Sequence, residues 1–168
     1  LQVRGGWEGV IEFHSMSKTF NMTGWRLGWA VGDRRLIGAL SRVKTFVDTG
    51  VFLAVQAAGA AALDQGGDWV RDNVAVFQQR RDRAVSALRD AGFDVSAPRA
   101  TMYLWIPVPG GEPSEEFARR ALTEEGVVVL PGAALGPGGE GFFRLALTSE
   151  PERLAEAARR LGRVARPS

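Results

Sequence analysis

Residues 13–29 read FHSMSKTFNMTGWRLGW, and this stretch decides the fold of the chain. Two short apolar runs, residues 10–13 and 27–32, enclose its polar part, and we predict both to be strands of a buried sheet. The glycine-containing segment between them is about as long as an active-site loop needs to be. The chemistry of the chain is therefore sought first in this loop.

Lys18 lies in the middle of the loop with the apolar neighbours Met16, Phe20 and Met22. We expect these neighbours to leave the amine poorly hydrated, and desolvation favours a neutral amine over an ammonium group. An ordinary lysine, with a pKa of about 10.4, is almost fully protonated at neutral pH. A lysine that attacks an aldehyde therefore needs such an apolar pocket, or a cationic neighbour such as Arg26.

Arg26 and two serines add the means to hold an anion. The guanidinium of Arg26 is a rigid fork of donors that matches a phosphate, and the hydroxyls of Ser15 and Ser17 can donate to the same group. With Lys18, these residues describe a site for an aldehyde cofactor that carries a phosphate, which is pyridoxal phosphate (PLP). The spacing alone supports equally a plainer interpretation, in which Lys18 is an exposed loop residue and Arg26 a salt-bridge partner.

Beyond residue 32 the pattern predicts helices and then a mixed α+β region. Three helices come first, over residues 34–46, 53–64 and 69–91. The predicted elements that follow are strands at 93–95, 102–106, 127–130 and 142–147 and a helix at 114–125. A final helix is indicated by a capping box of Ser149 and Glu152, with Pro151 in its first turn.

Two other motifs resemble functional sites, but we assign neither of them a chemical role. Residues 136–141, GPGGEG, could be mistaken for a phosphate loop, but no Gly-Lys-Ser/Thr follows and a strand comes next, so we predict a flexible turn. His14 beside Ser15 could suggest a hydrolase. However, adjacent residues at a strand end point in different directions, and the sequence shows no acid placed to orient the imidazole.

Composition excludes several classes of protein. The chain has 168 residues, 45% hydrophobic and 24% charged, with a net charge of +2, one histidine and no cysteine. The usual zinc, iron–sulfur and haem ligand sets cannot be assembled from these residues, so we predict no metal site. No apolar run approaches the roughly 20 residues of a membrane span, and the basic residues fall in helical patterns with acids nearby, so we predict neither membrane nor nucleic-acid partners. Because cysteine and a secretion signal are both missing, we expect a cytoplasmic protein.

Residues 13–29 resemble the cofactor-lysine signature of the class I/II, fold-type I, PLP-dependent aminotransferases. The likeness continues along the chain, where the sequence is similar to the LL-diaminopimelate aminotransferase branch at residues 43–44, 48–52, 56, 100–105, 126–132 and 142–147. The resemblance implies part of an α/β fold of the PLP-dependent transferase type. The implied divisions are the end of the large PLP-binding domain (1–66), a linking helix (67–92) and a small α+β C-terminal domain (93–168).

The same resemblance implies a role for each candidate residue. Lys18 would hold PLP covalently and move the proton between the substrate α-carbon and the cofactor. Ser15, Ser17 and Arg26 would bind the cofactor phosphate, and Arg144 would clamp the substrate α-carboxylate. Since Arg144 sits among apolar residues of a predicted strand, we expect it to be buried and to need an anionic partner, either a side chain or a substrate.

The implied activity is transfer of an amino group between glutamate and a 2-oxo acid by a homodimer. We predict LL-diaminopimelate aminotransferase of lysine biosynthesis. The alternatives are a broader alanine- or aspartate-type aminotransferase, a PLP-sensing domain of a transcription regulator, and a PLP-dependent lyase or decarboxylase. Trp25, Trp29, Tyr103 and Trp105 are interpreted as packing residues, with Tyr103 as a secondary candidate on the substrate side. Family segments that precede the cofactor lysine are missing before Leu1, so we expect the C-terminal part of a longer protein, inactive and prone to aggregate by itself.

Overall fold

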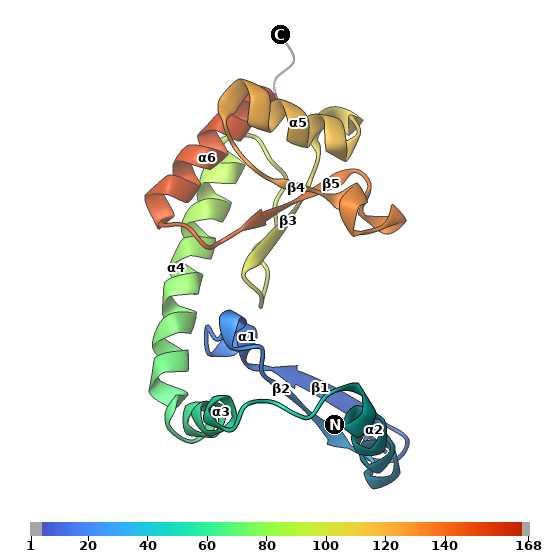
Figure 1. Ribbon diagram of the computed structural model, residues 1–168. Coiled ribbons are helices and arrows are strands. Elements are labelled where there is room, and N and C mark those ends of the chain that lie inside the picture. Colours follow the sequence, from blue (N-terminus) through green and yellow to red (C-terminus); the bar gives the residue numbers. More distant parts are fainter. Residues whose placement is uncertain (1–4, 166–168) are drawn as a thin grey trace. The chain divides into compact units, whose positions relative to one another are not determined.

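The computed structural model describes residues 5–165 and contains two compact units (Figure 1). The N-terminal unit comprises Leu1–Asp72 and the C-terminal unit Asn73–Ser168, so the boundary falls inside the long helix α4 (Gly67–Asp90). Within residues 5–165, no helix is both long enough and apolar enough to cross a bilayer. The division into domains at residues 66 and 92 stays a prediction.

The N-terminal unit is built on two antiparallel strands, β1 (Ile11–Ser15) and β2 (Gly28–Gly32). Both predicted strands are confirmed. The prediction that they belong to a buried sheet is wrong for the described residues, because β1 and β2 pair only with each other and their side chains are half-buried or exposed.

Glycine is required where β2 approaches β1. A Cβ on Gly28 would lie 2.5 Å from the carbonyl oxygen of His14, and one on Gly32 would collide with that of Val10. Both contacts are with backbone, which cannot move aside as a side chain can. Any larger residue would therefore separate the two strands.

Two helices follow, α2 (Arg34–Val47) and α3 (Leu53–Gln65), as predicted. The carboxylate of Asp33 caps α2 by accepting from the N–H of Arg35 at 2.8 Å. It also accepts from the N–H of Gly9 at 2.9 Å, which ties the segment before β1 to this helix. The Arg35 side chain, followed by these two N–H groups, holds the pKa of Asp33 well below its usual range.

The C-terminal unit contains a three-stranded antiparallel sheet in the order β3-β5-β4 (Figure 1). Its strands are β3 (Tyr103–Pro107), β4 (Leu130–Pro131) and β5 (Phe142–Ala146). The strand predicted at 93–95 is absent, and the one predicted at 127–130 is reduced to Leu130–Pro131. Strand pairing depends on distant partners, which the local apolar pattern does not reveal.

Helices α5 (Ser114–Glu125) and α6 (Pro151–Val164) and the end of α4 supply the rest of the core. Three aromatic rings lie at its centre: Phe93 meets Phe117 and Phe143 edge-on, and the last two are stacked 4.8 Å apart. Such pairs add to the free energy gained from burial alone. Three short 3-10 turns, at Pro109–Gly111, Gly132–Leu135 and Pro137–Gly139, connect the elements.

The capping box predicted for α6 does not form. The N-cap is Glu150 rather than Ser149, and its side chain makes no capping bond. Glu152 instead forms a bidentate pair with Arg83 of α4, with both N–O distances 3.0 Å. Pro151 does occupy the first turn, as predicted.

The turn at 136–141 is anchored, which corrects the prediction of a flexible turn. Glu140 accepts from the N–H of Ser114 at 2.8 Å and from its hydroxyl at 3.1 Å, and so caps α5 from 26 residues away. A Cβ on Gly139 would collide with the carbonyl oxygen of Gly132, so the backbones touch. The N–H groups of Ser114 and Gly141 and then the Ser114 hydroxyl lower the pKa of Glu140.

We predict that Glu140→Ala lowers the thermal midpoint of unfolding of the C-terminal unit by several degrees, because it leaves the buried Ser114 without its acceptor. A carboxylate whose pKa is lowered by folding stabilises the fold above its unfolded pKa, and this contribution is lost as the pH falls below about 4. The difference between wild type and variant should therefore shrink in acid. Glu115→Ala, in the first turn of the same helix, is the matched control. Equal midpoints for the two variants would contradict the assignment.

Candidate cofactor site

The loop between β1 and β2 folds into two short turns, α1 (Met16–Thr19) and the 3-10 turn Thr23–Trp25. Ser15 is the N-cap of α1, and its hydroxyl accepts from the N–H of Ser17 at 3.1 Å. The N–H of Met16 donates to the carbonyl oxygen of Leu27 at 3.1 Å, which continues the strand pairing into the loop. The two ends of the loop are thus tied together.

Met16 and Met22 form the inner side of this loop. Both are buried, and the carbonyl oxygen of Met16 accepts from the N–H of Met22 at 3.4 Å. Lys18 is exposed. The expectation that apolar neighbours cover this amine is therefore wrong for the described residues: the two methionines are turned into the unit, while Lys18 occupies the outer side of a one-turn helix.

Arg26 follows the second turn in a left-handed conformation, with φ 52°. Residues other than glycine adopt this conformation at a cost of roughly 1–2 kcal/mol. Its guanidinium Nη1 donates to the carbonyl oxygen of Thr23 at 2.6 Å, and the Thr23 hydroxyl donates to the carbonyl oxygen of Ser17 at 2.9 Å. Thr23, which was not among the candidate residues, therefore connects the positions of Arg26 and Ser17.

Neither Lys18 nor Arg26 forms an ion pair with any residue in the described part of the chain. The interpretation of Arg26 as a salt-bridge partner is therefore not supported. Lys44 provides a contrast, since its amine lies 2.6 Å from a carboxylate oxygen of Asp48. The loop brings together an amine, a guanidinium and two hydroxyls without a carboxylate in contact, and this donor set fits a cofactor that carries an aldehyde and a phosphate.

His14 has an acidic neighbour, Glu12, that was not expected from the sequence. Its Nε2 lies 2.6 Å from Oε1 of Glu12, two residues earlier on the same face of β1, and its ring stacks on Trp29 at 5.0 Å. The spacing of two along a strand could have revealed this pair. The imidazole is thus oriented by Glu12 and Trp29, while the Ser15 hydroxyl accepts from a backbone N–H, so the arrangement is not that of a hydrolase triad.

Arg144 lies on β5 in the C-terminal unit and is half-buried. The expectation that it is buried among apolar side chains is wrong, because strand residues alternate between faces: Phe143 and Leu145 face the core and Arg144 faces away. Its guanidinium carbon lies 4.3 Å from the centre of the Tyr103 ring. In the described chain it has no acidic partner.

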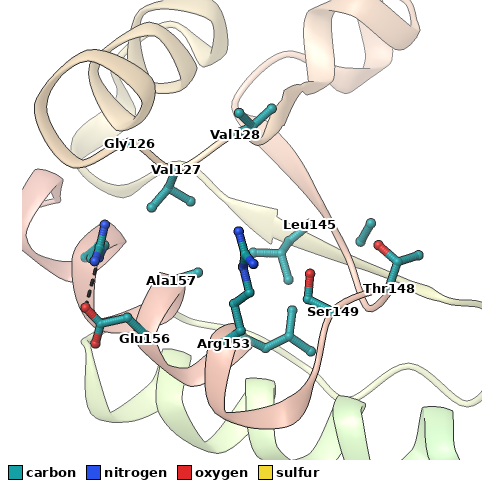
Figure 2. A pocket seen from close by; sticks show the side chains of 12 residues that line it. Gly126, Val127, Val128, Leu145, Thr148, Ser149, Arg153, Glu156 and Ala157 are labelled. Atoms are coloured by element: carbon teal, nitrogen blue, oxygen red, sulfur yellow. Dashed lines mark hydrogen bonds and ion pairs between the residues drawn. The ribbon is translucent and has the colours of Figure 1, made fainter.

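A cavity of about 490 Å³ opens elsewhere in the C-terminal unit (Figure 2). It lies between residues 126–128, the end of β5 and the first turns of α6, where Val127 and Val128 do not pair with β5. Figure 2 shows the guanidinium of Arg153 pointing into it between Val127 and Leu145. The lining residues include none of the predicted site residues, so this cavity is separate from the site of Arg144.

Comparison with known proteins places these observations in a family. The model of the family described as aminotransferase class I and II matches residues 2–161. The chain is 47% identical to an LL-diaminopimelate aminotransferase of Nitratidesulfovibrio vulgaris, over 98% of this chain and 42% of that protein. It is 48% identical to an LL-diaminopimelate aminotransferase of Dehalococcoides mccartyi, over 96% of this chain and 42% of that protein.

Solved structures of aminotransferases also match this chain. A probable N-succinyldiaminopimelate aminotransferase from Thermus thermophilus matches with a TM-score of 0.91 and 38% identity, over 96% of this chain and 44% of that one. The N-succinyldiaminopimelate aminotransferase from Mycobacterium tuberculosis matches with a TM-score of 0.88 and 31% identity, over 98% of this chain and 44% of that one.

The chain therefore belongs to the class I and II aminotransferases, a family of PLP-dependent enzymes with the fold-type I architecture. The structure holds a part of that fold. The chain spans about two fifths of the length of the curated relatives that it matches, 42% in two of them.

We predict that Gly28→Ala destabilises the cofactor-free protein by about 1–3 kcal/mol, because its Cβ would collide with the His14 carbonyl oxygen at the end of the loop. Gly24→Ala is the control within the same loop, since a Cβ there meets no atom within 4 Å. Urea unfolding of the wild type and both variants measures the free energy of unfolding that each substitution costs. If the two substitutions cost the same free energy, the close approach of β2 to β1 is not the constraint that we describe.

Proposed function

We propose that the protein is a PLP-dependent aminotransferase that exchanges an amino group between glutamate and a 2-oxo acid. The observation that carries this proposal is the loop in which Lys18, Arg26, Ser15 and Ser17 present donors without an acidic partner in the described chain. Family membership supports it, since aminotransferases of this class depend on PLP.

Each residue of the loop has a distinct task in this proposal. Bound PLP supplies an electron sink that makes the α-carbon of an amino acid acidic. Lys18 Nζ binds the cofactor covalently and carries the proton to and from the substrate α-carbon, which its exposed position in the described chain allows. The guanidinium of Arg26 and the hydroxyls of Ser15 and Ser17 bind the phosphate.

Arg144 binds the α-carboxylate of the substrate in this proposal. Its half-buried guanidinium faces away from the core of the C-terminal unit and meets no acid among the described residues. A guanidinium can pair with a carboxylate through two parallel hydrogen bonds, which fixes the orientation of the substrate as well as its position.

LL-diaminopimelate is the substrate that the relatives favour. Several proteins that are 46–48% identical to this chain are named LL-diaminopimelate aminotransferases. Two solved relatives, 38% and 31% identical, are named for N-succinyldiaminopimelate instead, so the succinylated compound is the second candidate. It shares the carbon skeleton and differs by an acyl group on one nitrogen.

We also propose that the working form is a homodimer. Large apolar side chains are exposed at the end of α2 and at the start of α3, with Phe46 93%, Val47 74%, Phe52 75% and Leu53 76% exposed. Apolar side chains gathered in this way are typical of a contact surface. The cytoplasmic location stays a prediction.

The substrate is tested with the complete protein encoded by the reading frame that holds these residues. Supplied with PLP, LL-diaminopimelate and 2-oxoglutarate, it should form glutamate in proportion to the diaminopimelate consumed. If glutamate forms with N-succinyldiaminopimelate and not with LL-diaminopimelate, the succinylated compound is the substrate. Formation of glutamate from neither compound, with alanine and aspartate also inert, would favour a PLP-sensing role.

We predict that Arg144→Ala raises the KM for both the amino acid and the 2-oxo acid at least 100-fold, because a charged hydrogen-bonding partner of the carboxylate is lost. The visible absorbance of bound PLP should be unchanged, since Arg144 has no part in holding the cofactor. Arg153→Ala, which removes an arginine that points into the separate cavity (Figure 2), is the matched control. An unchanged KM in Arg144→Ala would remove Arg144 from the site.

A further inference from the structure

Arg144 lies among aromatic side chains on one face of the sheet in the C-terminal unit. Arg144 lies directly opposite Trp105 across the β3–β5 pairing, and Tyr103 lies opposite Ala146, one step along the same face. The other face, which includes Leu104 and Phe143, forms the core. Arg144 and Tyr103 are therefore diagonal neighbours on the face that points away from the core.

The guanidinium of Arg144 lies over the ring of Tyr103. The guanidinium carbon of Arg144 lies 4.3 Å from the centre of the Tyr103 ring, within the range of a favourable cation–π interaction. Trp105 stacks instead on Phe142, with ring centres 5.5 Å apart and planes inclined by 15°. Among the described rings, Tyr103 is thus the one that supports the guanidinium.

This mode of support leaves the chemistry of Arg144 intact. The five N–H donors of a guanidinium lie in its plane, so a ring that covers one face occupies none of them. A carboxylate neighbour would act differently, since it would take the donors and neutralise the charge. Arg83 shows that alternative in the same unit, where both of its bonds go to Glu152.

We propose that Tyr103 is a positioning residue for Arg144, holding the guanidinium in place with its donors free for the carboxylate of an amino acid or 2-oxo acid. This inference rests on the proposed function of Arg144. An unsupported arginine would have to give up the freedom of its long side chain when substrate binds, and pre-ordering lowers that cost. Because β3 and β5 are hydrogen-bonded together, both residues start from fixed backbone positions.

A positioning role predicts a specific kinetic pattern. The carboxylate is bound in the ground state and in the transition state alike, and loss of such uniform binding raises KM while kcat is retained. In the complete protein with PLP, Tyr103→Leu should raise the KM for glutamate and for the 2-oxo acid about fivefold to tenfold, with kcat changed less than twofold. Tyr103→Phe, which keeps the ring, should restore the wild-type KM.

The matched control is Phe142→Leu, which removes a ring from the same face that stacks on Trp105 and not on Arg144. Its KM should stay within twofold of wild type. In an Arg144→Ala background, Tyr103→Leu should cause no further loss of kcat/KM, since the group that it positions is gone. Thermal midpoints and the visible absorbance of bound PLP verify that each variant is folded and loaded.

Three results would overturn the inference. A wild-type KM in Tyr103→Leu would show that the ring does not position Arg144. A raised KM in Tyr103→Phe would assign the effect to the hydroxyl. Equal losses from Tyr103→Leu in the presence and absence of Arg144 would show a merely structural role. A normal KM in Arg144→Ala is a separate outcome, because it would refute the proposed function of Arg144 itself and the inference with it.

Discussion

The hydrogen-bonded pairing of β1 with β2 is the constraint on which the candidate cofactor site depends. It brings Ser15 opposite Gly28, and the bond from Met16 to Leu27 extends the closure into the loop. The approach is so close that a side chain at position 28 would meet the backbone of β1. Ser15 and Arg26, eleven residues apart in the sequence, are thereby held at the same end of a closed loop, where we propose that they bind the phosphate.

We assign the binding of the two anionic groups to Arg26 and Arg144, which have no acidic partner in the described chain. Arg26 is held by the carbonyl oxygen of Thr23, and Arg144 is held by the ring of Tyr103. In both cases the neighbour supports the side chain without neutralising it. Arg83, in contrast, is paired with Glu152 and ties α4 to α6. A cation kept in place with its charge unsatisfied is what the binding of a phosphate or a carboxylate requires.

Much of the fold could be predicted from the sequence because its helices carry local signals. The helix after Asp33 was predicted within one residue of its observed end. Pairing partners lie far away in the sequence, so the strand expected at 127–130 and the cap that Glu140 provides were beyond local reasoning. Side-chain direction was also missed: Lys18 lies on the outer side of its turn, and Arg144 on the outer face of its strand. Residues alone left the role of the loop undecided, and resemblance to the family favoured the interpretation as a cofactor site.

The central claim is that Lys18 binds PLP, and the chain offers an internal control, because its only other lysine is Lys44. The amine of Lys44 is paired with Asp48, whereas Lys18 has no acidic partner in the described chain. The complete protein should be incubated with PLP, reduced with borohydride and digested, and the labelled peptide identified by mass spectrometry. The account predicts a label on Lys18 and none on Lys44. A label on Lys44, or no label within this chain, would contradict it.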